Sequence, residues 1–315
     1  MSEIPTFEDI QRAAERIRPY AHRTPVFTCT TLNERFGARL FFKCENFQKV
    51  GAFKFRGACN AVFSLSEEEA RRGVATHSSG NHAAALALAA RLRGTRAHIV
   101  MPENSAKIKI AAVKGYGATI TFCKPTLEAR ETTLAEVVEK TGATFIHPYD
   151  NIRVIAGQGT AAFELLQEVP DLDMIMAPVS GGGLMSGTAI AARGLAPRIE
   201  LIGVEPESAD DAYRSLQTGK LMPLTSSNTI ADGLRATLSK RTFTILRTHG
   251  CRIVTISEVG IIEGMRLVWE RMKIIIEPSA AVTIGALLEN KVEITGKRVG
   301  IILSGGNVDL DQLPW

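Results

Sequence analysis

Short apolar runs alternate along the chain with longer stretches in which hydrophobic residues recur every three or four positions. After Thr6, which suits a helix N-cap, Ile10, Ala14 and Ile17 fall on one face of a predicted helix. Apolar runs predict strands over residues 40–44, 74–76, 97–101, 119–123, 144–146, 174–178, 200–205, 252–256 and 299–303. Amphipathic stretches predict helices over residues 58–65, 81–93, 106–114, 127–140, 154–168, 184–193, 209–217, 259–272 and 280–289.

Strands that are apolar along their whole length and alternate with helices are typical of parallel sheets covered on both faces. We therefore predict an α/β fold. The strands are numerous for one open sheet in a chain of this size, which favours two sheets. The sequence has no Pro-, Gly- or Ser-rich linker that would cut it in two, so we expect a discontinuous domain arrangement.

Composition indicates a globular enzyme and argues against several other classes. The chain has 315 residues, 45% hydrophobic and 22% charged, which is enough for about two domains and too apolar for a disordered protein. Its 37 Lys and Arg against 33 Asp and Glu give a net charge of +4 without a basic block, so no nucleic-acid partner is expected. No apolar run is long enough to cross a bilayer, and the acidic N-terminal segment is unlike a signal peptide, so no membrane partner is expected.

Cysteine and histidine usage argues against a zinc enzyme. The five cysteines are scattered, odd in number and without a CxxC pair, which favours reduced thiols and a cytoplasmic location. The six histidines are equally dispersed and lack the spacing of zinc ligands.

Lys54 is the first candidate for chemistry. In GAFKFRGA it stands between Phe53 and Phe55, and apolar surroundings disfavour the ammonium form of a lysine. Such a lysine can act as a nucleophile or a base, and lysines of this kind form Schiff bases with pyridoxal phosphate (PLP). The alternative is a surface lysine whose stem covers apolar neighbours.

A dense polar segment, THSSGNH, follows the predicted strand 74–76 and opens an Ala-rich helix. Hydroxyls, an amide and free N–H groups at a helix N-terminus can bind a carboxylate. A simple helix cap by Ser79 or Asn81 is one alternative. A Ser/His hydrolase is another, although the GxSxG motif of such enzymes is absent.

Glycine turns follow two more strands. Ser180 to Gly183 precede a helix, and consecutive glycines let backbone N–H groups approach an oxyanion, so a phosphate is the expected guest. A dinucleotide fingerprint with Glu205 as the ribose ligand fits poorly, because its third glycine would fall on Ser186. The second turn, Ser304-Gly-Gly-Asn, follows the last strand and in isolation is equally an ordinary turn.

Together, and in this order, these segments resemble the fold-type II PLP enzymes, which have the tryptophan synthase β-like fold. The resemblance covers nearly the whole chain and is nearest to the branch of serine racemases and catabolic serine/threonine dehydratases (threonine ammonia-lyases). It is carried by KCENFQKVGAFKFRGA, THSSGNHAAALA, IAGQGT, SGGGLMSG, VEPESADDAY, TIADGL, LVWERMKIIIEPSAA and LSGGNVDL.

The resemblance implies how PLP is bound. Lys54 forms the Schiff base and Phe53 packs on the pyridine ring, while Asn81 bonds the 3-hydroxyl and Ser304 faces the ring nitrogen. The phosphate lies on the segment Ser180, Gly181, Gly182, Gly183 and Leu184. A serine at the ring nitrogen leaves it unprotonated, which suits prompt β-elimination.

The resemblance also assigns substrate contacts. The amino-acid carboxylate lies on the loop Ser78, Ser79, Gly80, Asn81 and His82. Ser79 stands across the cofactor from Lys54, so that a base on each face permits racemisation. Arg130 matches a residue that reaches the far end of the substrate, where an arginine can pair with a second carboxylate. The alternative for Arg130 is a surface pairing with Glu128 or Glu131.

A divalent cation, Mg²⁺ or Ca²⁺, is implied at Glu205, the Ala209 carbonyl and Asp211, whose oxygens suit such ions. On the residues alone, EPESADD is more often a solvated acidic helix start.

We therefore expect a PLP-dependent ammonia-lyase that converts L-threonine to 2-oxobutyrate and L-serine to pyruvate, with release of ammonia. The alternatives are a serine racemase or a threo-3-hydroxyaspartate dehydratase on the same scaffold and, remotely, a small-molecule binding protein without catalysis. The resemblance further implies a homodimer and two domains, each a mostly parallel sheet covered by helices. The large PLP-binding domain comprises residues 1–72 and 150–315, and the small substrate-binding domain comprises residues 73–149.

Overall fold

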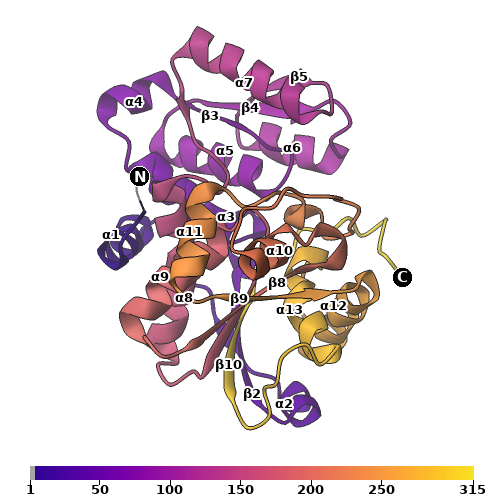
Figure 1. The fold of residues 1–315 in the computed structure, drawn as a ribbon. Helices are drawn as coiled ribbons and strands as arrows, with labels where there is room; N and C mark the ends of the chain where they lie inside the picture. The colour runs from indigo at the N-terminus through magenta and orange to yellow at the C-terminus, as the bar shows by residue number, and fades with distance from the viewer. Residues whose placement is uncertain (1–3) are drawn as a thin grey trace.

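The protein is built around two separate sheets (Figure 1). The computed structural model describes residues 4–315, and at residue 108 it describes the backbone only. The strands are β1 (Val26–Phe27), β2 (Arg39–Cys44), β3 (Val74–His77), β4 (Ala97–Pro102), β5 (Thr119–Cys123), β6 (Thr144–Phe145), β7 (Met174–Pro178), β8 (Glu200–Pro206), β9 (Arg252–Ile256) and β10 (Arg298–Leu303). One sheet has the order β5-β4-β3-β6 and the other β1-β2-β10-β7-β8-β9. Among the described strands every neighbouring pair is parallel except β1 with β2, which confirms the predicted α/β class with two sheets.

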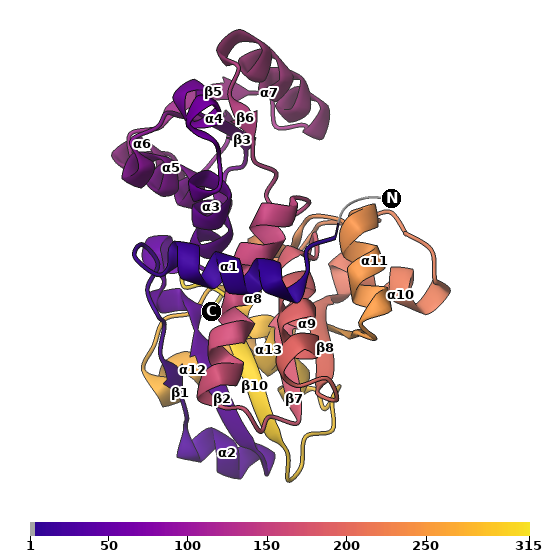
Figure 2. The same ribbon diagram turned by 90° about the vertical axis from the view of Figure 1, so that its left-hand side faces the viewer.

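Helices cover both faces of each sheet. They are α1 (Phe7–Ile17), α2 (Thr30–Phe36), α3 (Lys54–Phe63), α4 (Glu67–Arg72), α5 (Asn81–Arg93), α6 (Lys107–Gly115), α7 (Leu127–Thr141), α8 (Ile152–Glu168), α9 (Gly183–Leu195), α10 (Asp211–Thr218), α11 (Lys240–Thr248), α12 (Glu258–Met272) and α13 (Pro278–Leu288). Figure 2 shows α1 lying across α8 and α9, with the four-stranded sheet and its helices above.

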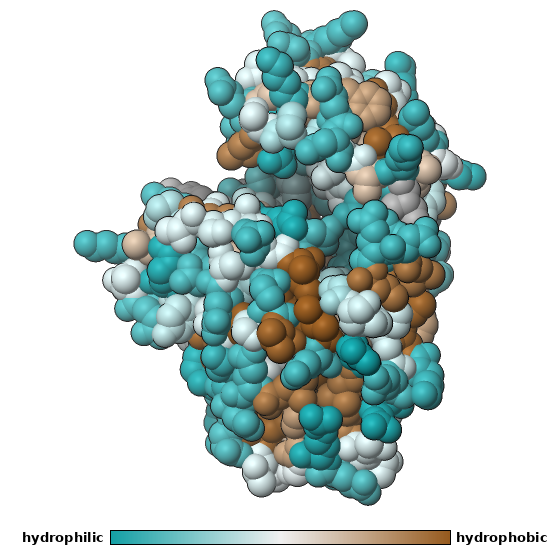
Figure 3. All heavy atoms as spheres, turned by 90° about the vertical axis from the view of Figure 1, so that its right-hand side faces the viewer, coloured by the Kyte–Doolittle hydropathy of each residue, from teal (hydrophilic) through white to brown (hydrophobic). Residues whose placement is uncertain are grey.

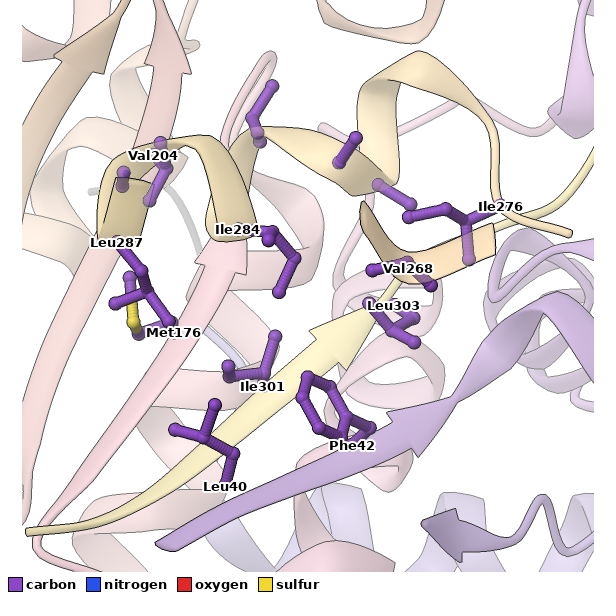
Figure 4. Packing of buried hydrophobic residues seen from close by; sticks show 14 of the residues in the cluster. Leu40, Phe42, Met176, Val204, Val268, Ile276, Ile284, Leu287, Ile301 and Leu303 are labelled. Atoms are coloured by element: carbon purple, nitrogen blue, oxygen red, sulfur yellow. The ribbon is translucent and has the colours of Figure 1, made fainter. Parts of the chain in front are cut away.

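The core of the six-stranded sheet follows the period-two alternation of its strands. Along β7, Met174 and Met176 pack on one side with α12 and α13, whereas Ile175 and Ala177 pack on the other with α8 and α9. Figure 4 shows the first of these layers, where side chains of β2 and β10 meet α13. Burying each side chain of this size stabilises the folded state by about 1.5–3 kcal/mol. The sheet and its two helix layers therefore form a stable scaffold for the residues at the strand ends.

The four-stranded sheet packs in the same way. Val74 and Ile99 face α3 and α5, and Ala75 and Val100 face α7. All of its strands fall inside the predicted small domain of residues 73–149, while α3, which packs on α5, comes from the preceding segment. The exact domain bounds stay a prediction.

Several elements differ from the prediction. Helix α3 begins at Lys54 rather than at residue 58, because the backbone before Lys54 is fixed by contacts with the end of β10 that the local sequence does not reveal. Helices α2, α4 and α11 and the two-residue strand β1 were not predicted. Helix α4, for example, buries only Ala70, so it presents no hydrophobic stripe; its capping box of Ser66 and Glu69 marks its start.

None of the helices within residues 4–315 combines the length and the apolar character needed to span a membrane. The five cysteines are all free thiols, as their scattered spacing predicted.

Candidate active site

The carboxyl ends of the strands in the two sheets face a hollow between the upper and lower parts of the molecule, which Figure 3 shows from one side. Ligands of open α/β sheets bind at such strand ends. The candidate residues from the two sheets are therefore brought to one place.

Lys54 is positioned by the turn that follows β10. The Phe53 N–H donates to the Ser304 carbonyl at 2.9 Å, and the Gly306 N–H donates to the Gly51 carbonyl at 2.9 Å. Ser304 itself is buried. Lys54 and Ser304, two of the predicted site residues, are 250 positions apart and thus belong to two backbone segments joined by hydrogen bonds.

Lys54 is half-buried, and its amine is held by contacts with neighbouring groups. Its Nζ lies 5.2 Å from the centre of the Phe53 ring and donates to the Pro148 carbonyl at 3.0 Å. Burial disfavours the ammonium form and lowers the pKa of Lys54 to about 8, although the nearby Glu277 carboxylate opposes this effect. A lysine with such a pKa is partly neutral near neutral pH and can act as a nucleophile or a base.

The glycine turn Ser180–Gly183 joins β7 to α9. Gly182 has a φ of +84°, and a Cβ on Gly181 would lie only 2.4 Å from the Tyr149 ring, so this turn requires glycine. The first N–H groups of α9 have no partners within the helix and form a cradle for an anion. The Ser180 hydroxyl is already engaged, because it accepts from the Ala236 N–H at 3.0 Å and lies 3.2 Å from the Ala236 carbonyl. Leu184 is buried in the core behind the turn.

Helix capping does not account for the polar side chains of the loop after β3. The N-cap of α5 is Gly80, and neither Ser79 nor Asn81 makes a capping hydrogen bond. The Ser78 hydroxyl accepts from the Gly80 N–H at 3.3 Å, and Ser79 is half-buried. The Ser79 hydroxyl makes no hydrogen bond among the described residues and therefore remains available to a ligand.

His82 is turned away into the protein. Its ring is buried with Nε2 3.2 Å from the Ile146 carbonyl, and burial lowers its pKa to about 3, so the ring stays neutral. Its contribution to the predicted carboxylate site would therefore come from its backbone.

Arg130 lies in the first turns of α7, close enough to His77 to help lower the pKa of that ring, although burial of His77 is the larger cause. Its Nε donates to the Thr126 carbonyl at 3.3 Å. Within residues 4–315 no ion pair joins Arg130 to Glu128, Glu131 or any other acid, so the predicted surface pairing is not formed. The two terminal guanidinium nitrogens of Arg130 have no hydrogen-bond partner among the described residues.

Glu205 and Asp211 are buried, which overturns their interpretation as a solvated acidic helix start. Glu205 Oε1 accepts from the Tyr213 N–H at 2.6 Å, whereas Oε2 has no partner among the described residues. Burial raises the pKa of Glu205 well above its usual value and that of Asp211 to about 6. The described chain has no cluster of three or more His, Cys, Asp or Glu, but these carboxylates and the nearby Ala209 carbonyl offer the oxygen ligands that a divalent cation prefers.

Four residues at the site were not assigned an individual role in the sequence-based prediction. Pro148 accepts from Lys54, Tyr149 covers the glycine turn, and Glu277 and Asn307 hold Asn81. Glu277 and Asn307 lie inside segments that carry the family resemblance, and Glu277 directly precedes a proline at the start of an apolar helix. A proline after Glu277 at the start of an apolar helix marks a helix N-terminus, and this signal could have identified Glu277 from the sequence.

The amine of Lys54, with its lowered pKa, contacts Pro148, and the next residue, Tyr149, lies against the glycine turn that forms the anion cradle. An amine and an anion cradle held in this way suit a cofactor that carries both an aldehyde and a phosphate. Residues 17–305 match the family described as "Pyridoxal-phosphate dependent enzyme", and the chain belongs to this family.

Relatives that carry the name of an enzyme activity align with nearly the whole of this chain. A "beta-hydroxyaspartate dehydratase" of Paracoccus denitrificans is 50% identical, covering 99% of each chain. A "Serine racemase" of Dictyostelium discoideum is 52% identical, covering 98% of this chain and 96% of the relative. Among solved structures, the maize serine racemase is 45% identical with a TM-score of 0.96, covering 98% of this chain and 95% of that one. The predicted fold-type II architecture is thereby confirmed.

Proposed function

We propose that the protein is a PLP-dependent ammonia-lyase whose substrate is 3-hydroxyaspartate, which it converts to oxaloacetate and ammonia. The dependence on PLP follows from the family, and both the lyase reaction and the substrate are supported by the relative named beta-hydroxyaspartate dehydratase. Threonine and serine dehydration, the first expectation from the sequence, has less support, because the two relatives of 50% and 52% identity reported above carry other names.

The observation that carries this proposal is the unpaired Arg130. Hydroxyaspartate differs from serine by a second carboxylate, and a guanidinium binds a carboxylate through two parallel hydrogen bonds. Arg130 is near enough to His77, the last residue of β3, to influence the pKa of that ring, and the loop proposed to hold the first carboxylate follows His77 directly. A dianionic substrate would thus be held at both ends.

The residues of the chain fit PLP. The N-terminus of α9 and its glycine turn would hold the phosphate, Phe53 would pack on the ring, and Ser304 would face the ring nitrogen. When bound, PLP draws electrons from the α-carbon of an amino acid and so makes the α-proton removable. Lys54 would be the base that accepts this proton, and its hydrogen bond to the Pro148 carbonyl holds its Nζ in place.

Serine racemisation is the second candidate, favoured by the racemase relative and by Ser79. A hydroxyl on the face opposite Lys54 would return a proton from the other side. Ser79 is half-buried in the substrate loop and is not used as a helix cap, which leaves its hydroxyl available.

We further propose that Glu205, the Ala209 carbonyl and Asp211 bind Mg²⁺ or Ca²⁺, and that the protein forms a homodimer. The unpartnered Glu205 Oε2 supports the cation, since a buried carboxylate oxygen without a partner is costly. The homodimer follows from the family resemblance.

The proposal is tested by incubating the purified holoenzyme and Mg²⁺ with L-threo-3-hydroxyaspartate, L-serine or L-threonine in separate reactions. We expect oxaloacetate to form fastest. Formation of pyruvate or 2-oxobutyrate alone would assign the protein to the serine/threonine dehydratases, and formation of D-serine without any 2-oxo acid would assign it to the racemases.

A further inference from the structure

Three polar side chains from distant segments meet beside Lys54. Asn81 begins α5, Glu277 is the N-cap residue of α13, and Asn307 follows β10. The Asn81 Nδ2 lies 3.0 and 3.1 Å from the two Glu277 carboxylate oxygens. The Asn307 Nδ2 donates to the Asn81 Oδ1 at 2.9 Å, so the Asn81 amide is held from both ends.

This network fixes which way the Asn81 amide faces. The Asn307 Nδ2 also lies 2.7 Å from the Val50 carbonyl, which can only accept, so the nitrogen of Asn307 must be on this side. It therefore donates to the oxygen of Asn81, and the nitrogen of Asn81 must face Glu277, an acceptor when ionised. Reversing the Asn81 amide would set nitrogen against nitrogen and oxygen against carboxylate.

The surrounding backbone is shaped to admit these side chains. A Cβ on Gly305 would lie 2.6 Å from the Glu277 Oε1, and a Cβ on Gly51 would lie 2.7 Å from the Asn307 Oδ1. The Asn307 N–H lies 3.3 Å from the Glu277 Oε2, and the Glu277 N–H donates to the Gly305 carbonyl at 3.0 Å. The turn after β10 thus closes around the carboxylate.

Glu277 is unusual because its side chain accepts from neutral groups and makes no ion pair among the described residues, although only 4% of the residue is exposed. The charged groups that influence it are Lys54, Lys109 and Asp232, and the last two pair with each other. Burial raises the pKa of Glu277 to about 7. A buried carboxylate without a cationic partner disfavours folding, so stability does not account for it.

We propose that Glu277 and Asn307 are positioning residues that orient the Asn81 amide toward the oxygen on the PLP ring. The two hydrogens of an amide nitrogen diverge widely, so only one is directed at the Glu277 carboxylate. The other remains to donate to the cofactor. The inference rests on the cofactor contact that the family resemblance implies for Asn81, and it is independent of the proposed substrate.

The test is equilibrium binding of PLP to apoprotein at about pH 8, where the Glu277 carboxylate is ionised, for Asn81→Ala, Glu277→Ala, Asn307→Ala and the double variants with Asn81→Ala. Each single variant should weaken PLP binding by about tenfold, because each removes a hydrogen bond to the cofactor or the support of that bond. The double variants should bind no more weakly than Asn81→Ala alone, since all act through one amide. The bound cofactor should show the same altered visible absorption in every variant.

Glu289→Gln is the matched control. Glu289 also accepts hydrogen bonds at a helix start, from the Ser257 N–H and hydroxyl, but it does not contact Asn81. Its replacement should leave PLP affinity unchanged. If Glu277→Ala does not fold, Asn307→Ala tests the same amide from its other end. Affinity equal to that of the unaltered protein in these variants, or losses that multiply in the double variants, would overturn the proposal.

Discussion

The Lys54 Nζ donates to the Pro148 carbonyl at 3.0 Å, and this bond joins the two halves of the site. Lys54 begins a helix whose preceding backbone is held by the end of β10, whereas Pro148 follows β6 of the other sheet. The amine is therefore positioned from both sheets, in surroundings that favour its neutral form.

Attachment of PLP to the apoprotein should accelerate with pH through a midpoint near 8. The protonated amine has no lone pair to attack the aldehyde, so the rate is low below the pKa of Lys54, which burial lowers to about 8, and level above it. Stopped-flow absorbance from about pH 6 to about pH 10 measures this. A rate still rising toward 10.5, the ordinary lysine value, would show that the amine is not desolvated.

Gly181→Ala should weaken cofactor binding and reduce stability. The new methyl would lie 2.4 Å from the Tyr149 ring, and overpacking of this kind costs about 1–3 kcal/mol while displacing the phosphate cradle. Urea unfolding and PLP titration give the two readouts. Gly115→Ala is the control, because nothing lies within 4 Å of its Cβ position in α6; an equal loss in both would refute the role of the Tyr149 contact.

Arg56 should be a main support of the helix that carries Lys54. Its side chain is fully buried and pairs with Glu45 at 2.7 Å and Glu164 at 2.8 Å. Arg56→Ala leaves the buried Glu45 uncompensated, which should lower the free energy of unfolding by about 3–5 kcal/mol. Arg72→Ala, which removes an exposed ion pair with Glu68, should cost at most about 1 kcal/mol. Equal costs would contradict this account.

Removing divalent cations should lower the melting temperature, and adding Mg²⁺ or Ca²⁺ should restore it. The cation would neutralise Glu205 and Asp211, which are buried and whose pKa values are raised by burial. Glu205→Gln should stabilise the cation-free protein, because it removes a buried charge, and should abolish the response to Mg²⁺. A Glu205→Gln protein that still responds would place the cation elsewhere.

The fold was largely predictable because its signals are local. Helix α5 and strands β5, β7 and β9 have the predicted bounds, since periodicity and flanking turn residues mark them clearly. Strand β1 spans only two residues, and α4 buries a single side chain, so neither leaves a periodic pattern.

The site was predictable in its parts but not in its contacts. Lys54, the glycine turn and Ser304 received their roles from the ordered set of segments that resembles the family, and the structure brings Lys54 and Ser304 onto hydrogen-bonded backbone segments. Glu277 and Pro148 matter only through tertiary contacts, with Asn81 and Lys54, over distances in sequence that no local pattern spans.

The most direct test of the proposed substrate is the effect of Arg130 on discrimination between substrates. We predict that Arg130→Ala lowers kcat/KM for L-threo-3-hydroxyaspartate by about a hundredfold, the value of a bidentate pair with a carboxylate, while kcat/KM for L-serine changes little. Lys140→Ala, at the far end of the same helix, should leave both unchanged. Equal losses for both substrates, or no loss for hydroxyaspartate, would contradict the account.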